Sequence, residues 1–106
     1  MSKCKPIILS QGPQYCVSQC EDCQRVGLHY HHLMIGFELR EFRQFTKQYL
    51  ALPLDRHLML FPDGSERIIL NTPHPDIQLN LTRQEFNQLA DLLQQARLML
   101  DVRELI

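Results

Sequence analysis

The amino-acid sequence predicts an α+β fold with a mainly antiparallel sheet of about six to seven short strands. Several segments alternate apolar and polar residues with the period of two that is typical of a strand with one buried face, most clearly residues 33–39. Turn residues such as Pro62-Asp63-Gly64 join neighbouring strand segments as hairpins. Two segments show helical spacing, but strands and helices do not alternate as they would around a parallel sheet.

The first amphipathic helix is expected at about residues 39–51. Phe42, Phe45 and Tyr49 recur at helical spacing and form one apolar stripe. Pro53 ends the helix, because the residue before a proline is disfavoured in the α region. We expect this stripe to pack on one face of the sheet.

The second helix is expected at about residues 82–99 and has the clearest start signal in the chain. Thr82 and Glu85 have the spacing of a capping box, with Thr82 as the N-cap. Leu81 and Phe86 flank this box as a hydrophobic staple. The apolar stripe of this helix should cover the same face of the sheet as the first helix. Residues 101–106 either extend the helix or form an edge strand.

Length and composition predict one ordinary globular domain over residues 1–106, with a cysteine-containing hairpin region at residues 1–30 integrated into it. A net charge of -1 gives no electrostatic reason to expect nucleic acid or an anionic membrane as a partner. No apolar run approaches the ~18 residues of a membrane span. The N-terminal apolar run is too short for a signal peptide, so we expect a cytoplasmic protein with reduced thiols.

The cysteines predict a structural zinc knuckle. Cys20 and Cys23 have the two-residue spacing at which two thiolates converge on one Zn²⁺ at about 2.3 Å. A tight turn at Gln11-Gly12-Pro13 would place Cys4 beside Cys20 on the neighbouring strand. The predicted metal ligands are therefore Cys4, Cys20 and Cys23, with Cys16 as a further candidate.

The fourth ligand is left open between Cys16, a histidine of residues 29–32, and none. Cys16 lies four residues before Cys20, roughly 13 Å away on a regular strand, and would need a bulge to reach the metal. His29 and His31 share a strand face in this reading, and are interpreted as surface imidazoles. Two other interpretations of the cysteines remain: buried small thiols, and thiol redox chemistry. The redox interpretation is disfavoured because a strand, and no helix N-terminus, follows Cys23.

No catalytic constellation is recognisable in the chain. The sequence contains no glycine-rich phosphate loop, no Gly-x-Ser-x-Gly and no His-Glu-x-x-His. Acidic residues are scattered, and no nucleophile, base and oxyanion donors are brought together. We therefore expect a non-enzymatic protein with no catalytic residues.

A basic helix face supplies the alternative function. Arg40, Arg43 and Lys47 lie opposite the apolar stripe of the first helix and would form a nucleic-acid contact face beside the knuckle. Acidic residues interrupt this charge, so the electrostatic contribution to such binding would be small.

The order of these features resembles a family of small bacterial proteins known as a domain of unknown function. The family pattern runs from an N-terminal cysteine through a Cys-x-x-Cys knuckle to a helix that opens Glu-Phe and a closing leucine-rich helix. Cys4, Cys20, Cys23, Phe42 and Phe86 match it, whereas the usual glycine after the second knuckle cysteine is Gln24 here. The resemblance implies the order of elements and no activity.

The sequence thus predicts a small binding or adaptor module with a structural zinc knuckle. Exposed edge strands and the apolar end Leu105-Ile106 indicate contacts with a protein partner or self-association as a homodimer. The biological role and the identity of a partner do not follow from the sequence.

Overall fold

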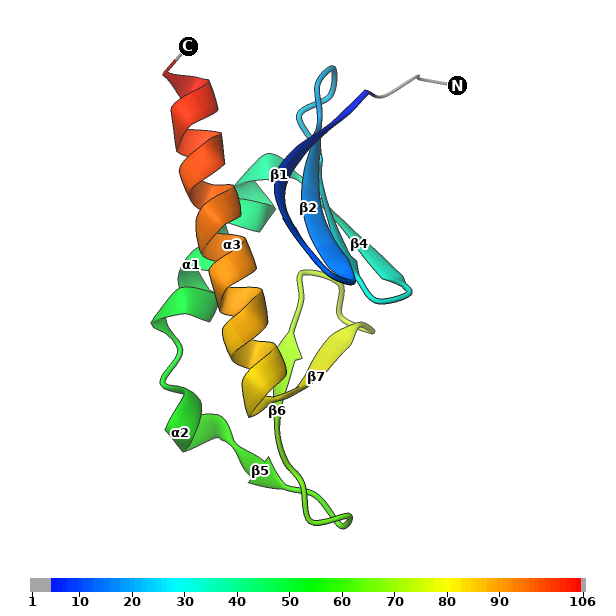
Figure 1. Cartoon of the computed structure of the whole chain (residues 1–106), viewed down its shortest axis with the longest axis vertical. Helices are drawn as coiled ribbons and strands as arrows, with labels where there is room; N and C mark the ends of the chain where they lie inside the picture. The colour runs from blue at the N-terminus through cyan, green and yellow to red at the C-terminus, as the bar shows by residue number, and fades with distance from the viewer. Residues whose placement is uncertain (1–4, 106) are drawn as a thin grey trace.

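The computed structural model describes residues 5–105, which form an α+β fold of two antiparallel sheets and three helices (Figure 1). The elements follow in the order β1 (Pro6–Gly12), β2 (Tyr15–Cys20), β3 (Val26–Tyr30), β4 (Leu33–Phe37), α1 (Leu39–Ala51), α2 (Leu54–His57), β5 (Met59–Leu60), β6 (Glu66–Asn71), β7 (Gln78–Thr82) and α3 (Arg83–Glu104).

The first sheet is a meander in the order β1-β2-β3-β4. Val17 pairs with Leu28, and Leu28 pairs with Ile35, so these three side chains form one row across the sheet. All three are 0–1% exposed. This row therefore marks the face of the sheet that packs on the core, as the alternation in the sequence predicts.

The second sheet has the order β5-β6-β7. Its first hairpin closes around Gly64, which has a φ of +85° and so occupies the left-handed region that favours glycine. Ile68 pairs with Leu81 across β6 and β7, and both side chains are at most 1% exposed. This small sheet adds its buried face to the same core.

Helix α3 connects the two sheets through the core. It contacts β1 and β2 of the first sheet, β6 and β7 of the second, and α1 beside it (Figure 1). The predicted capping box is present: the Glu85 N–H donates to Thr82 Oγ1 at 3.2 Å and the Thr82 N–H donates to Glu85 Oε1 at 2.9 Å. Helix α1 has the predicted bounds, and Phe42, Phe45 and Tyr49 are buried.

Two specific hydrogen bonds position the helices: one joins α3 to the first sheet and the other joins α1 to α3. The buried Ser10 hydroxyl of β1 donates to the Leu92 carbonyl of α3 at 2.8 Å. The Tyr49 hydroxyl of α1 donates to the Phe86 carbonyl at 2.9 Å, and its ring stacks on Phe86 at 4.6 Å between centroids. Burial raises the pKa of Tyr49, so this hydroxyl remains a donor at all ordinary pH values.

The prediction of a single sheet is wrong, because the strands form two separate sheets. The loop before β7 covers part of the edge of β4, where His74 Nε2 donates to the Gly36 carbonyl at 2.8 Å. A side chain thus satisfies a carbonyl that a neighbouring strand would otherwise pair with. The sequence shows each hairpin but not whether separate hairpins share an edge.

The predicted pairing of the first hairpin is also wrong. The prediction placed Cys4 beside Cys20, whereas Pro6 is the residue that pairs with Cys20, because the turn lies at Pro13-Gln14 and the register shifts between Ile8 and Ser10. Cys4 itself lies outside the described residues. The short helix α2 was not predicted. Helix α3 extends to Glu104, so the described part of the C-terminal segment extends the helix and does not form an edge strand.

Candidate metal centre

The Cys-x-x-Cys segment forms a closed turn between β2 and β3. The Cys20 N–H donates to the Arg25 carbonyl at 2.8 Å, and the Gln24 N–H donates to the Cys20 carbonyl at 3.0 Å. The Cys23 N–H donates to Cys20 Sγ at 3.4 Å. This bond holds the Cys23 backbone against the Cys20 sulfur and so closes the turn.

Gln24 adopts the left-handed conformation, with a φ of +63°. Glycine is the residue that most readily takes this conformation, which agrees with the glycine expected after the second knuckle cysteine. The Gln24 side chain adds hydrogen bonds of its own: Oε1 accepts from Gln19 Nε2 at 3.0 Å, and Nε2 donates to the Glu21 carbonyl at 3.1 Å. These hydrogen bonds hold Gln24 in a backbone conformation that is strained for a residue with a Cβ.

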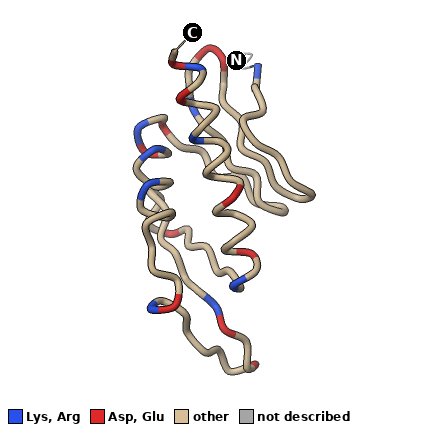
Figure 2. Tube along the Cα trace, turned by 60° about the vertical axis from the view of Figure 1, so that its left-hand side comes forward, with Lys and Arg blue, Asp and Glu red and all other residues tan. Residues whose placement is uncertain are grey.

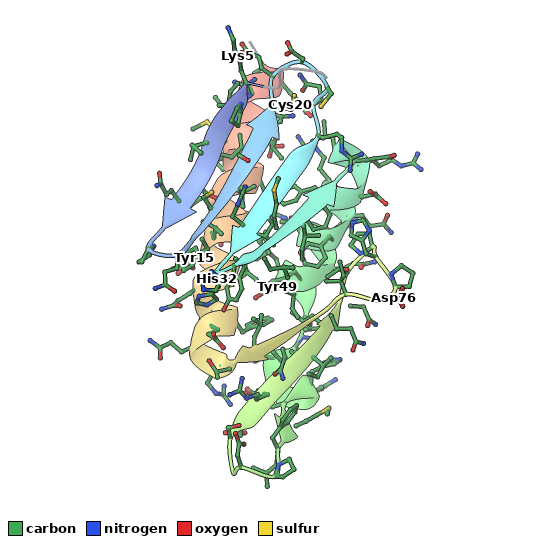
Figure 3. The ribbon with its side chains drawn as sticks, turned by 90° about the vertical axis from the view of Figure 1, so that its right-hand side faces the viewer. Lys5, Tyr15, Cys20, His32, Tyr49 and Asp76 are labelled. Carbon is green, nitrogen blue, oxygen red and sulfur yellow. The ribbon has the colours of Figure 1, made fainter. Side chains whose placement is uncertain are left out.

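The turn is attached to β1 and to the end of α3. The Glu21 N–H donates to the Lys5 carbonyl at 3.1 Å, which places Lys5 and Cys20 at the same end of the first sheet (Figure 3). Gln19 is only 2% exposed, and its Oε1 accepts from Arg103 Nε at 3.3 Å. The conformation of the turn is therefore linked to the last turn of α3 through Gln19.

The sulfur atoms of the turn differ in exposure and bonding. Cys20 is 8% exposed and is disulfide-bonded, whereas Cys23 is exposed. A sulfur in a disulfide is not a thiolate, so Cys20 must be reduced before it can bind a metal. Both residues line the same hollow of about 370 Å³ on the outer face of the first sheet.

Cys16 does not belong to this turn. It lies four residues before Cys20 in β2, which pairs regularly with β3 from Tyr15 to Gln19, so the two residues are roughly 13 Å apart. The bulge that would bring Cys16 to the turn is absent from this stretch of the described chain. No group of three or more His, Cys, Asp or Glu side chains within residues 5–105 converges as metal ligands would.

The prediction that His29 and His31 share a strand face is wrong. His31 lies in the two-residue turn between β3 and β4, with a φ of +56°, and its ring turns toward Gln14 and α3. Its Nε2 lies 3.7 Å from Glu85 Oε2. Burial raises the pKa of Glu85, but hydrogen bonds from Thr82 and Tyr30 outweigh that effect, and the net pKa is lowered.

The predicted basic face of α1 is partly neutralised in three dimensions. Arg43 forms ion pairs with Asp101 at 2.9 Å and Glu104 at 2.7 Å, both on α3. Figure 2 shows Lys and Arg interspersed with Asp and Glu along the chain. Arg40 and Lys47 alone are a weak basis for contacts with a phosphate backbone, whose affinity depends on several neutralised phosphates.

Comparison with known families identifies the group to which the chain belongs. Residues 1–105 match the family described as "Family of unknown function (DUF6686)". The chain belongs to the DUF6686 family. No curated protein and no solved structure matches it. This DUF6686 protein has no helix within its described residues that is long and apolar enough to cross a membrane.

Proposed function

We propose that this chain is a small, non-enzymatic binding module of the reducing cytoplasm, in which the turn at Cys20–Cys23 holds one structural Zn²⁺. The observation that carries the proposal is the hydrogen bond from the Cys23 N–H to Cys20 Sγ, together with the left-handed Gln24. Both features prepare the turn to present two sulfur atoms to one ion. Cys4 is the proposed third ligand and lies outside the described residues.

The proposed partner is a second copy of the chain, contacted through the end of α3. Leu98, Val102 and Leu105 are spaced by four and three residues and so lie on one helix face. They are 66%, 43% and 87% exposed. An isologous contact would bring this stripe against the same stripe of the other copy. The stripe is small beside the ~20–30 residues per side of a stable interface, so we expect a weak dimer.

The two parts of the proposal are physically linked. Arg103 lies between Val102 and Glu104 on α3 and donates to Gln19, which donates to Gln24 of the turn. A metal that fixes the turn would therefore also restrict the last turn of α3, where the apolar stripe lies. Zinc would act as a stabiliser of the contact surface and not as a reagent.

Metal content tests the zinc site. Protein purified under reducing conditions should contain about one Zn²⁺ per chain, and this should be lost in Cys20→Ser and in Cys23→Ser. Cys16→Ser is the matched control and should retain the metal, because Cys16 lies outside the turn. Reduced, folded protein that takes up no zinc, or a turn that stays disulfide-bonded in reducing buffer, would refute the zinc site.

Sedimentation velocity over a range of concentrations tests the dimer. The weight-average sedimentation coefficient of the wild type should rise with concentration, and Leu98→Glu or Val102→Glu should abolish this rise. Leu60→Glu is the control, because Leu60 is 76% exposed and lies in β5, outside the helix stripe. A wild type that stays monomeric at millimolar concentration would remove the second copy as the partner.

A further inference from the structure

We propose that the outer face of the first sheet carries a second metal site, independent of the Cys20–Cys23 turn, in which Cys16, His29 and Met34 bind Cu(I). The three residues come from three adjacent strands, β2, β3 and β4. None of the functions proposed above uses His29 or Met34.

Strand register places the three residues in one row. Cys16 pairs with His29, and His29 pairs with Met34, so a sulfur-containing side chain flanks the imidazole on each side. Cβ atoms of directly paired residues in antiparallel strands lie about 4.5–5.5 Å apart. Side chains of this length can therefore meet above the central strand.

The row faces away from the core. The adjacent row of Val17, Leu28 and Ile35 is buried on the inner face, and successive residues of a strand alternate between faces. His29 is exposed, Met34 is 59% exposed and Cys16 is partly exposed. A solvent ion can thus reach the row without any movement of the backbone.

The three side chains are available for coordination. Cys16 is a free thiol. Within residues 5–105, neither a hydrogen bond nor an ion pair engages the side chains of Cys16, His29 or Met34. The Met34 methyl group lies above Gly27, 3.0 Å from the position that a Cβ would take there. Methionine has three rotatable bonds, so its sulfur can turn toward His29 at little cost.

The donor atoms select the metal. A thiolate, an imidazole and a thioether form a soft set, which is typical of copper and favours Cu(I) in particular. Zinc sites use cysteine, histidine and carboxylates, so a methionine ligand argues against zinc at this row. Cys16 and His29 also line a hollow of about 460 Å³, which His32 borders.

The row borders the Cys20–Cys23 turn, because His29 and Met34 line the same hollow of about 370 Å³ as Cys20 and Cys23, and Cys16 is the ligand that distinguishes the two sites. Cys16 lies roughly 13 Å along β2 from Cys20. His32, at the other border of the hollow, lies at the end of the first sheet opposite to Cys20 (Figure 3). Substitution of Cys16 therefore tests copper at the row, and substitution of Cys23 tests zinc at the turn.

Methyl NMR reads the proposed site directly. Reduced protein with ¹³C-methyl methionine is loaded with zinc and then titrated anaerobically with Cu(I) to two equivalents, so that copper capture by the turn does not exhaust the metal. The Met34 methyl resonance should shift, while those of Met59 and Met99 should not. Zinc at the turn borders the same hollow as Met34, so the Met34 methyl resonance of the zinc-loaded protein is the reference for the copper titration.

Variants separate coordination from indirect effects. Cys16→Ser should abolish the Met34 shift, and Met34→Leu should weaken Cu(I) binding to the row on the order of tenfold or more in competition with a Cu(I) chelator. Met59→Leu is the matched control, since Met59 is 51% exposed on the other sheet, and should leave that affinity unchanged. His29→Ala serves as the second variant if Cys16→Ser fails to fold by circular dichroism.

Two results would overturn the proposal. The first is a Met34 methyl resonance that does not shift at two equivalents of Cu(I), while copper binds at the turn alone. The second is a Met34 shift that persists in a folded Cys16→Ser or His29→Ala variant. Neither result bears on the zinc content of the turn, so the two metal proposals fail independently.

Discussion

Gln24 offers the sharpest test of how the Cys20–Cys23 turn is stabilised. Its φ of +63° places a residue with a Cβ in the left-handed region, which costs about 1–2 kcal/mol relative to the right-handed one. Its side chain offsets part of this cost through hydrogen bonds to Gln19 and to the Glu21 carbonyl, each with a net contribution of ~0.5–1.5 kcal/mol. Glycine and alanine substitutions separate the two effects.

Gln24→Ala removes the side-chain hydrogen bonds and keeps the backbone strain, so it should destabilise the protein by about 1–2 kcal/mol. Gln24→Gly removes the same hydrogen bonds but relieves the strain, so it should be ~1 kcal/mol more stable than Gln24→Ala. We expect the glycine variant to lie close to the wild type.

Urea denaturation of reduced, metal-free protein measures these differences, with equal m values as the control for an unchanged unfolded state. Gln24→Asn is a useful third variant, because asparagine tolerates the left-handed region better than alanine does. A glycine variant that is less stable than the alanine variant would refute the reasoning, since it would mean that left-handed strain does not limit the turn.

Two further predictions concern the core and the helix cap. Thr46 is 0% exposed and its Oγ1 has no hydrogen-bond partner among the residues described, so Thr46→Val should stabilise the protein by about 1 kcal/mol in urea denaturation; Thr46→Ser, which keeps the hydroxyl, should not. The lowered pKa of Glu85 means that its ionised form stabilises the fold above the unfolded pKa of about 4.3, and that this contribution is lost as the pH falls through the lower folded value. Glu85→Gln should therefore cost stability at pH 7 and much less near pH 3, and an equal cost at both pH values would contradict this assignment.

Sequence patterns predicted the helices well because the start and end of a helix depend on residues that lie close together in the sequence. Thr82 and Glu85 lie three residues apart, and their capping box is present at the start of α3. The bounds of α1 follow in the same way from its aromatic stripe and Pro53. The Cys20–Cys23 spacing likewise marked a turn, and the turn is present, although the zinc assigned to it remains a prediction.

Contacts between distant segments could not be predicted in this way. The sequence places Arg43 on a basic face of α1, whereas Asp101 and Glu104 neutralise it from 58 and 61 residues away. At the division between the two sheets, His74 donates to the Gly36 carbonyl from 38 residues away. The pairing of the first hairpin was wrong because its turn lies at Pro13-Gln14 and its register shifts within β1.

The sequence by itself determined the α+β class, the two amphipathic helices and the Cys-x-x-Cys turn, because periodicity, caps and short spacings act within a few residues. Tertiary structure alone decided which side chains lie side by side across strands. Cys16, His29 and Met34 are spread over 19 residues of sequence, and only the register of three strands aligns them on one face. A shift of one residue in the strand pairing would turn a side chain to the opposite face of the sheet. The strand register, and not the spacing in the sequence, therefore determines whether the three side chains meet.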